Sequence, residues 1–258
     1  ARSPVLRRSN QHPVSPGNIE RNPRLIVTMG LHGSASTWVF NVVRDLLIAA
    51  HGDGQVRALY AESEHDVMAE KGDHLGYLVW KLHFGDSGFD DFVSRAAPMI
   101  IVSIRDPRDA VVSMMQRFGM SFESAAAAIA RDCNRALRSI AAGHPYLRYE
   151  DGFFRNPDMI GSIAQWLGVP TDPSGFRQIF ERYESTAVRR FAENIANLPP
   201  ERIVGDPAGD LSDTLTLIHR HHVGDMRSGK WRDALSTDQH HILAGFAPFL
   251  LQFKYPLA

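Results

Sequence analysis

The sequence predicts a single α/β domain with a central parallel β-sheet flanked by helices. Short apolar runs rich in β-branched residues alternate with longer helical patterns, which is the order that crossover connections in a parallel sheet require. A glycine-containing turn, MGLHGSASTW at residues 29–38, joins the first strand-like run to the first helix-like run. With 258 residues and 44% hydrophobic side chains, the chain can bury one sizeable core.

The predicted elements follow one another with short connections. Strands are expected at residues 24–29, 56–61, 76–83, 98–104 and 144–151. Helices are expected from Thr37, near residues 87–96, from Pro107, over about residues 121–142, and then at residues 156–169, 173–197 and 236–253. Asp106 stands at a helix-cap position, and Ser236 and Gln239 have capping-box spacing. Residues 198–210, dense in proline, glycine and aspartate, predict a loop.

Composition and charge exclude several classes of protein. The 28 Lys and Arg residues balance 29 Asp and Glu residues, so the whole chain lacks the positive footprint of a nucleic-acid or anionic-membrane binder. No run reaches the roughly 20 apolar residues that span a bilayer. Residues 1–23 lack the apolar segment of a secretory signal, so we expect a mobile N-terminal arm before a domain at residues 24–258. We therefore expect a soluble, cytoplasmic protein.

The turn at residues 29–38 is typical of a phosphate-binding loop, because small residues let the backbone approach an anion at the start of a helix. Against the pattern G-x4-G-K-[ST], Gly30 and Thr37 fit, but Ala35 replaces the second glycine and Ser36 the lysine. The missing lysine disfavours hydrolysis of ATP or GTP and favours a ligand that ends in one phosphate. A plain strand-to-helix turn stays open as the alternative. Trp38 could stack on a purine or belong to the core.

Two further groups lie at the ends of predicted strands, at the sheet edge where open α/β proteins bind ligands. Arg105 and Ser113 could hold a second phosphate, although Arg105 could instead pair with Asp109. Lys81 and His83 lie two residues apart and so share one face. One could supply charge and the other a base, although a lone histidine is more often structural.

A late segment, GDMRSGKWRD, adds a third basic group. Arg227, Lys230 and Arg232 surround Gly229 in a backbone that could close over an anion. Histidines 219, 221 and 222 lie nearby, but nothing in the sequence singles out matching Asp, Glu or Cys ligands, and Cys133 is the only cysteine. We expect no metal site.

Taken together, the phosphate-binding loop and the basic groups that follow it along the chain resemble those of the PAPS-dependent sulfotransferases. These are P-loop-type enzymes whose donor is 3′-phosphoadenosine 5′-phosphosulfate (PAPS) and whose nucleotide product is PAP. The resemblance spans about residues 25–232. The family's Lys-Ser-Gly-Thr-Thr-Trp loop is similar to GSASTW, and its Arg-x-Pro-[Lys/Arg]-Asp-x-x-x-Ser element is similar to RDPRDAVVS. The resemblance implies that the donor is bound by His32, Gly33, Ser34, Ala35, Ser36, Thr37, Trp38, Arg105, Ser113, Tyr149, Arg227, Ser228 and Gly229. It implies that His83 is the catalytic base and Lys81 its helper, since KLH resembles the family's Lys-Thr-His.

The sequence departs from the family pattern in two places. Gly224, Asp225 and Met226 stand where the family has Arg-Lys-Gly, so Arg227 takes the phosphate role three residues later. Gly33 stands where the family usually has a lysine or arginine that neutralises the leaving oxygen. Lys81 or His32 could substitute, another basic residue could swing in, or the protein could lack activity; we favour Lys81.

The resemblance implies in-line transfer of a sulfuryl group from PAPS to a hydroxyl or amine, with PAP as product and no metal. A PAP- or nucleotide-binding module without catalysis and a P-loop kinase are the alternatives. The acceptor could be a small molecule, a glycan or a lipid, contacted by residues 62–75, 84–95, 115–124 and 186–212. Neither the acceptor nor the oligomeric state can be read from the sequence.

Overall fold

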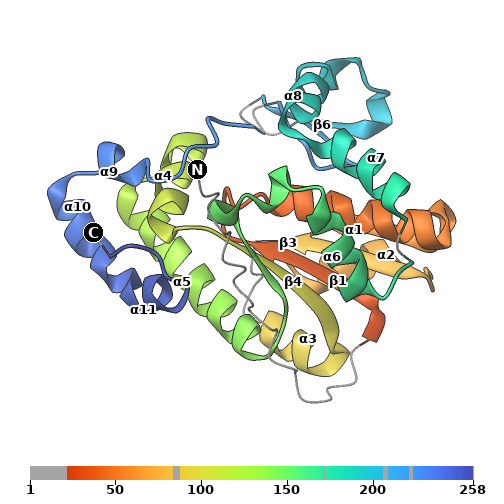
Figure 1. Ribbon diagram of the computed structural model, residues 1–258, viewed down its shortest axis with the longest axis horizontal. Helices are drawn as coiled ribbons and strands as arrows, with labels where there is room; N and C mark the ends of the chain where they lie inside the picture. The colour runs from red at the N-terminus through yellow and green to blue at the C-terminus, as the bar shows by residue number, and fades with distance from the viewer. Residues whose placement is uncertain (1–21, 84–87, 171, 206–208, 221–222, 258) are drawn as a thin grey trace, which may run out of the picture.

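The computed structural model describes residues 22–83, 88–170, 172–205, 209–220 and 223–257. Its centre is a five-stranded parallel sheet in the order β2-β3-β1-β4-β5 (Figure 1). The strands are β1 (Asn22–Gly30), β2 (Val56–Tyr60), β3 (Tyr77–Leu82), β4 (Pro98–Ile104) and β5 (Tyr146–Arg148). The predicted fold class is thus confirmed, with β1 in the middle of the sheet.

Helices connect the strands and continue after the last of them. They are α1 (Ser36–His51), α2 (Glu64–Lys71), α3 (Phe89–Ala96), α4 (Pro107–Phe118), α5 (Phe122–Ala141), α6 (Asp158–Leu167), α7 (Pro173–Tyr183), α8 (Ser185–Glu193), α9 (Trp231–Ala234), α10 (Thr237–Ile242) and α11 (Ala247–Gln252). Asp106 caps α4 as expected, since its carboxylate accepts from the backbone N–H of Arg108 at 3.0 Å. The capping box at Ser236 and Gln239 is also present.

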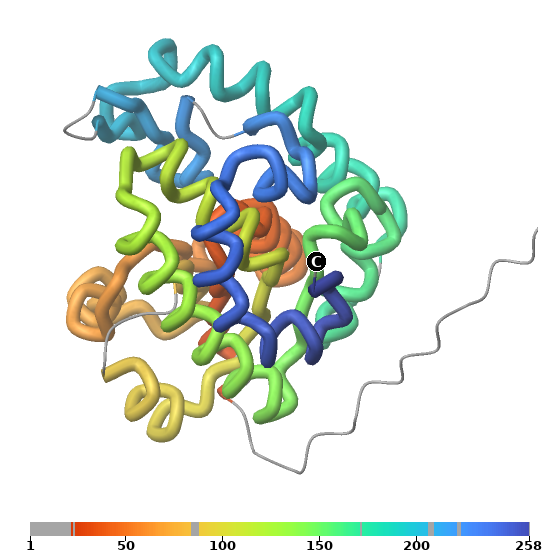
Figure 2. The backbone as a smooth tube through the Cα atoms, turned by 90° about the vertical axis from the view of Figure 1, so that its left-hand side faces the viewer, coloured from red at the N-terminus to blue at the C-terminus, as the bar shows by residue number. Residues whose placement is uncertain are grey.

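The two faces of the sheet bury two separate cores. Alternate residues of a strand point to opposite faces, and accordingly Val27 packs with α4, α5 and α11, whereas Ile26 packs with α1, α6 and α7. Figure 1 shows α4, α5 and the C-terminal helices on one side of the sheet and α1, α6 and α7 on the other. In Figure 2 the C-terminal segment runs alongside α4 and α5. The helices are therefore fixed on both faces, and the edge where the strands end is left to build the site.

The structure differs from the predicted elements mainly after β4. The strand expected at residues 144–151 keeps only three residues, and the chain turns into a 3-10 segment at Tyr149. The helix expected at residues 173–197 breaks at Glu184, which has an extended backbone with ψ 155°. The last helix restarts at α11, where Pro248 occupies the first turn and lacks the donor that continuation would need.

Several smaller features complete the description. The loop predicted at residues 198–210 contains β6 (Ile203–Gly205), which pairs antiparallel with β7 (Leu211–Asp213). Strand β1 takes in residues 22 and 23, and the rest of the expected arm, residues 1–21, lies outside the described residues. Cys133 is buried in α5, and burial raises the pKa of its thiol. No helix in the described ranges is long and apolar enough to cross a membrane.

Candidate active site

A cavity of about 700 Å³ opens at the edge where the parallel strands end. The β1–α1 loop, the ends of β3 and β4, α4, and the segment before α9 all contribute to its wall. Most of the predicted site residues line it: His32, Gly33, Ala35, Ser36, Thr37, Trp38, Lys81, His83, Arg105, Ser113, Tyr149 and Arg227. Ser34, Ser228 and Gly229 are not among its lining residues. The fold thus brings together segments from distant parts of the sequence.

The β1–α1 loop presents backbone and hydroxyl groups to the cavity. Gly33 and Ala35 both have left-handed backbone, with φ 72° and 61°, and α1 starts immediately afterwards with Ser36 and Thr37. Because the first N–H groups of a helix lack internal partners, this end of α1 is suited to an anion. The Ser34 side chain points away, into a 2.8 Å hydrogen bond with the Ser103 hydroxyl on β4. Ser34 therefore braces the loop against the sheet.

Gly33 is fixed as glycine by its surroundings. A Cβ atom at this position would meet the Arg105 Nη1 atom at 2.9 Å and the Ser113 hydroxyl at 3.2 Å, on a backbone of positive φ. A lysine here would require the loop, the guanidinium or α4 to shift. The close approach of Arg105 and α4 thus explains why the loop carries no cation at this residue, and other elements must supply positive charge to the cavity.

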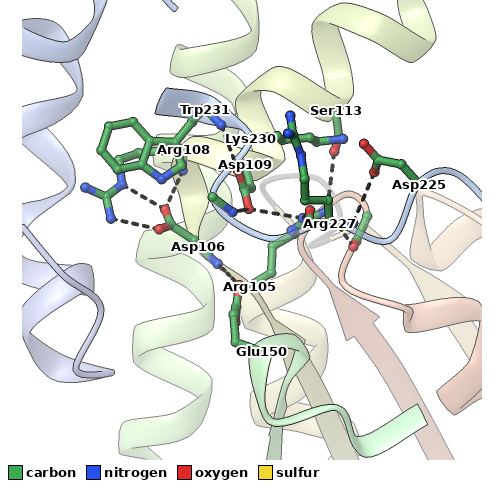
Figure 3. Close-up of polar contacts among 12 residues, drawn as sticks. Arg105, Asp106, Arg108, Asp109, Ser113, Glu150, Asp225, Arg227, Lys230 and Trp231 are labelled. Atoms are coloured by element: carbon green, nitrogen blue, oxygen red, sulfur yellow. Dashed lines mark hydrogen bonds and ion pairs between the residues drawn. The ribbon is translucent and has the colours of Figure 1, made fainter. Parts of the chain in front are cut away.

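Arg105 is the most connected of the predicted residues. Its buried guanidinium donates to the carbonyl oxygens of Gly33 (3.0 Å) and Arg227 (3.3 Å). It also donates to the Ser113 hydroxyl at 3.4 Å, pairs with Asp109 at 3.2 Å, and lies 4.5 Å above the Tyr149 ring. In Figure 3, Arg105 lies among Asp109 and Ser113 of α4 and Arg227 of the late segment. The ion pair considered from sequence exists, and Arg105 nevertheless remains part of the cavity wall.

Asp109 holds the late segment in place. Its fully buried carboxylate accepts from the backbone N–H groups of Gly229 at 2.7 Å and Trp231 at 3.1 Å, besides pairing with Arg105 (Figure 3). Gly229, with φ 79°, is therefore a turn that is fixed to α4 rather than a cavity-lining residue. The Arg227 side chain lines the cavity and pairs with the exposed Asp233 at 3.4 Å.

Lys230, in the basic late segment, lines the cavity. It was not among the residues predicted to bind the donor. Its ammonium donates to the Gln116 side chain at 3.4 Å. Burial and the neighbouring Arg105 lower the pKa of Lys230. In the sequence, the glycine immediately before Lys230 was the one feature that could have indicated this role. Glycine permits a turn that directs the following side chain toward a ligand.

His83 is held in one tautomer. Its Nδ1 atom lies 2.9 Å from the carbonyl oxygen of Gly30, and a carbonyl can only accept, so in the neutral ring Nδ1 carries the proton and Nε2 the lone pair. The ring stacks on His32 with centroids 4.0 Å apart. Burial, Lys81 and His32 hold the pKa of His83 well below its usual range. His83 is thus a neutral imidazole whose Nε2 atom carries the lone pair.

Lys81 is a buried cation at the end of β3. Its ammonium lies 5.0 Å from the centre of the Tyr60 ring on the neighbouring strand. Burial, with help from Arg117, lowers the pKa of Lys81 to about 8, against the attraction of Glu62. Lys81 therefore carries its proton at neutral pH but gives it up more readily than an exposed lysine.

Trp38 and Tyr149 form an aromatic wall of the cavity. Trp38 is nearly buried against Phe153, with ring centroids 5.5 Å apart, yet it also lines the cavity. Tyr149 stacks on Phe154 at 4.8 Å and faces the cavity below Arg105. Flat apolar surfaces of this kind suit a base or another planar group.

The expected acceptor regions contribute unequally among the described residues. Gln116, Arg117 and Phe118 at the end of α4 line the cavity, as do Val188 and Asp210. His219, which also lines the cavity, lies 3.2 Å from the Asp210 carboxylate. Histidines 221 and 222 lie outside the described residues, and within the described ones no group of three His, Cys, Asp or Glu side chains could hold a metal ion.

Comparison with known proteins identifies solved structures that share this fold. No protein-family model matches the sequence, and no curated protein matches it either. Among solved structures, the chain is similar to retinol dehydratase in a complex with retinol and PAP, at 14% identity and a TM-score of 0.57, covering 88% of this chain and 81% of that one. It is similar to retinol dehydratase with androsterone and inactive cofactor PAP at 14% identity and a TM-score of 0.58, with the same coverage of 88% and 81%.

A third solved structure gives the same result. Mouse sulfotransferase SULT7A1 complexed with PAP shares 13% identity at a TM-score of 0.57, and the match covers 90% of this chain and 84% of that one. Identities this low establish the fold alone. The chain therefore has the α/β fold of these PAP-bound proteins, one of them a sulfotransferase.

Proposed function

We propose that this protein is a PAPS-dependent sulfotransferase that moves a sulfuryl group to an acceptor hydroxyl, with His83 as general base. The shared fold supports this proposal, because the three similar structures were all solved with PAP. The cavity supports it as well, since the start of α1 and the Arg105 guanidinium, two groups suited to anions, both line it. A donor that carries a 5′-phosphosulfate and a 3′-phosphate would use both.

The observation that carries the proposal is the fixed tautomer of His83. The bond from Nδ1 to the Gly30 carbonyl leaves Nε2 as the proton acceptor beside the phosphate loop. An acceptor hydroxyl that gives its proton to Nε2 becomes nucleophilic next to the donor's sulfur. The acceptor oxygen then forms a bond to sulfur, while the bond to the bridging oxygen breaks and its electron pair stays on the 5′-phosphate. Transfer in line needs positioning and charge stabilisation and no covalent intermediate.

The remaining residues divide between the two ends of the donor. Ser36 and Thr37, with the N–H groups that begin α1, bind the 5′-phosphate, and Lys81 stabilises its growing charge. His32 stacks on His83 and lies 3.8 Å from the Asp132 carboxylate. Lys81 takes over the part of the cation that Gly33 cannot supply.

At the other end, cationic and aromatic side chains hold the adenosine. Arg105 and Ser113 bind the 3′-phosphate, joined by Lys230 and Arg227 from the late segment. Trp38 and Tyr149 provide flat surfaces for the adenine. Arg105 keeps its bond to Asp109 in this arrangement, so its charge is already oriented before the donor arrives.

The experiment is a screen with sulfur-labelled PAPS across phenols, sugars, steroids and amines. Sulfated product with at least one class supports the proposal. Thermal stabilisation by PAP without product in any class would favour a nucleotide-binding module that has lost catalysis, which the absence of a cation at Gly33 makes the second candidate. Magnesium-dependent turnover of ATP would contradict both and favour a kinase.

A further inference from the structure

The end of α4 carries charge and aromatic surface that the donor does not account for. We infer that the acceptor bears a negative charge close to its reacting hydroxyl, and that Arg117 recognises this charge. The inference rests on the proposed function in one respect, since it takes the Nε2 atom of His83 as the point where the hydroxyl is activated.

A continuous chain of ring contacts connects Arg117 to His83. The His83 ring stacks on His32 at 4.0 Å, and His32 meets the edge of Phe118 at 5.7 Å. The Arg117 guanidinium in turn lies 4.9 Å from the centre of the Phe118 ring. Arg117, Phe118, His32 and His83 all line the same cavity. The guanidinium therefore belongs to the same end of the cavity as the base.

The position of Arg117 on α4 separates it from the donor's 3′-phosphate. Ser113, which receives a hydrogen bond from Arg105, lies four residues earlier on the same helix. Four residues advance about 6 Å along a helix axis and return to nearly the same face. Arg117 is thus one turn beyond the Arg105 wall, on the side where His32 and His83 lie.

The electrostatics of this end agree with that placement. Arg117 contributes to the lowered pKa values of both Lys81 and His83, so its charge acts on the two groups closest to the transfer. Asp132 lies 3.8 Å from His32, and Glu62 attracts Lys81. An anionic group on the acceptor would meet the Arg117 charge at this same end of the cavity.

The exposure of Phe118 suggests how the acceptor is seated. Phe118 is 51% exposed, which leaves a flat apolar surface next to the guanidinium. A carbon skeleton lying over this ring can extend a carboxylate, phosphate or sulfate to Arg117 while its hydroxyl reaches His83. Arginine suits this role because its planar fork binds such oxyanions with two hydrogen bonds. The chemical step is unchanged, and Arg117 acts by holding the acceptor in line.

The test compares acceptors that carry the same hydroxyls and differ in one charged group. Suitable pairs are 4-hydroxyphenylacetate with 4-hydroxyphenylacetamide, and methyl glucuronide with methyl glucuronamide. We expect kcat/KM of the protein to favour the anionic member by roughly ten- to a hundredfold, the value of a charge-assisted hydrogen bond. Arg117→Gln should bring the ratio close to one, and Arg117→Glu should reverse it. A phosphate-bearing phenol in the same assay shows whether carboxylate or phosphate is preferred.

Two controls separate this inference from the proposed function. Arg177→Gln, an exposed arginine on α7 outside the cavity lining, should leave the ratio unchanged. The affinity for PAP should be the same in Arg117→Gln as in the unaltered protein. Equal use of both members of every pair, or a loss of PAP affinity in Arg117→Gln, would overturn the role of Arg117 while sulfuryl transfer stands. A protein that neither binds PAP nor sulfates any member would overturn both proposals.

Discussion

The two ends of the cavity are built by different means. At the Arg105 end, a buried ion pair with Asp109 and two backbone N–H bonds fix α4, the β1–α1 loop and the late segment to one another. At the His83 end, one backbone hydrogen bond, a stacked pair of imidazoles and a buried lysine do the positioning. The first end is rigid and charge-paired, whereas the second is held by ring contacts and desolvation.

That difference matches two tasks. A phosphate site gains from cations that are oriented before the ligand arrives, because little reorganisation is then needed on binding. A base must be unprotonated to accept a proton, and burial and neighbouring cations keep His83 in its neutral form. The comparison predicts that substitutions at the Arg105 end affect stability and donor affinity, and that those at the His83 end affect rate.

The largest effect is expected from His83→Ala. Removing the base should lower kcat by about 10²- to 10⁴-fold, the usual contribution of general-base catalysis. The PAP dissociation constant should change little, because the contacts proposed for the nucleotide are elsewhere. Steady-state rates and calorimetric titration with PAP measure the two quantities. Turnover near that of the unaltered protein would remove His83 from the mechanism.

Asp109→Asn should produce the largest loss of stability. The change leaves Arg105 buried without its carboxylate, and breaking a buried pair in this way costs about 3 to 5 kcal/mol in the free energy of unfolding. The matched control is Asp132→Asn at the other end, where the His32 Nδ1 atom is 3.8 Å away and the loss should be about 1 kcal/mol or less. Denaturant unfolding of both variants is the measurement, and equal losses would contradict the contrast between the ends.

The pH dependence of the rate should reveal Lys81. Its pKa of about 8 predicts that kcat/KM falls as pH rises through that value, because the charge that stabilises the leaving phosphate is lost. The low pKa of His83 predicts no matching fall just below its ordinary 6.5. Lys81→Met should be slower and should lack the decline near pH 8. A decline that persists in this variant would assign it to another group.

Lys81 should also make the stability of the protein depend on pH, in a direction that follows from its lowered pKa. The folded pKa of about 8 lies below the ordinary 10.5, so between these values the unfolded chain binds more protons. Stability of the unaltered protein should therefore rise with pH across that window. Lys81→Met should remove this rise, which thermal unfolding at several pH values can detect.

The smallest effect is expected from Tyr255→Phe. The Tyr255 hydroxyl donates to Glu150 at 2.8 Å, and Glu150 accepts the backbone N–H of Asp106 at 2.9 Å, next to Arg105. Losing one such hydrogen bond should cost about 1 kcal/mol while the ring stays packed. PAP affinity should weaken slightly, through the position of the segment that carries Arg105. A variant with unchanged stability would show that the C-terminal segment does not brace this end.

Much of the framework could be predicted from local patterns. The alternation of apolar runs and helical periods gave the strands of the sheet, and Asp106 with Pro107 marked the start of α4. Positions at strand ends brought Lys81, His83 and Arg105 to one edge, since parallel strands end together. These features depend on short-range rules that a single sequence carries.

The rest depends on contacts between distant segments. The bond from His83 to Gly30 joins residues 53 positions apart, and Asp109 reaches Gly229 across 120 positions. Such pairs leave no local pattern, so the tautomer of His83 and the fixing of the late segment could not be read from sequence. The pairing of β6 with β7 was not predicted either, because proline and glycine dominate the segment around β6 and indicate a loop.

The central claim is that the cavity joins a PAPS donor to an acceptor at His83. A single-turnover reaction tests it most directly: the protein is mixed with sulfur-labelled PAPS and the best acceptor from the screen, and both products are counted. The account predicts labelled acceptor and PAP in equal amounts. PAP formed without labelled acceptor, or bound PAPS that stays intact with every acceptor, would contradict it.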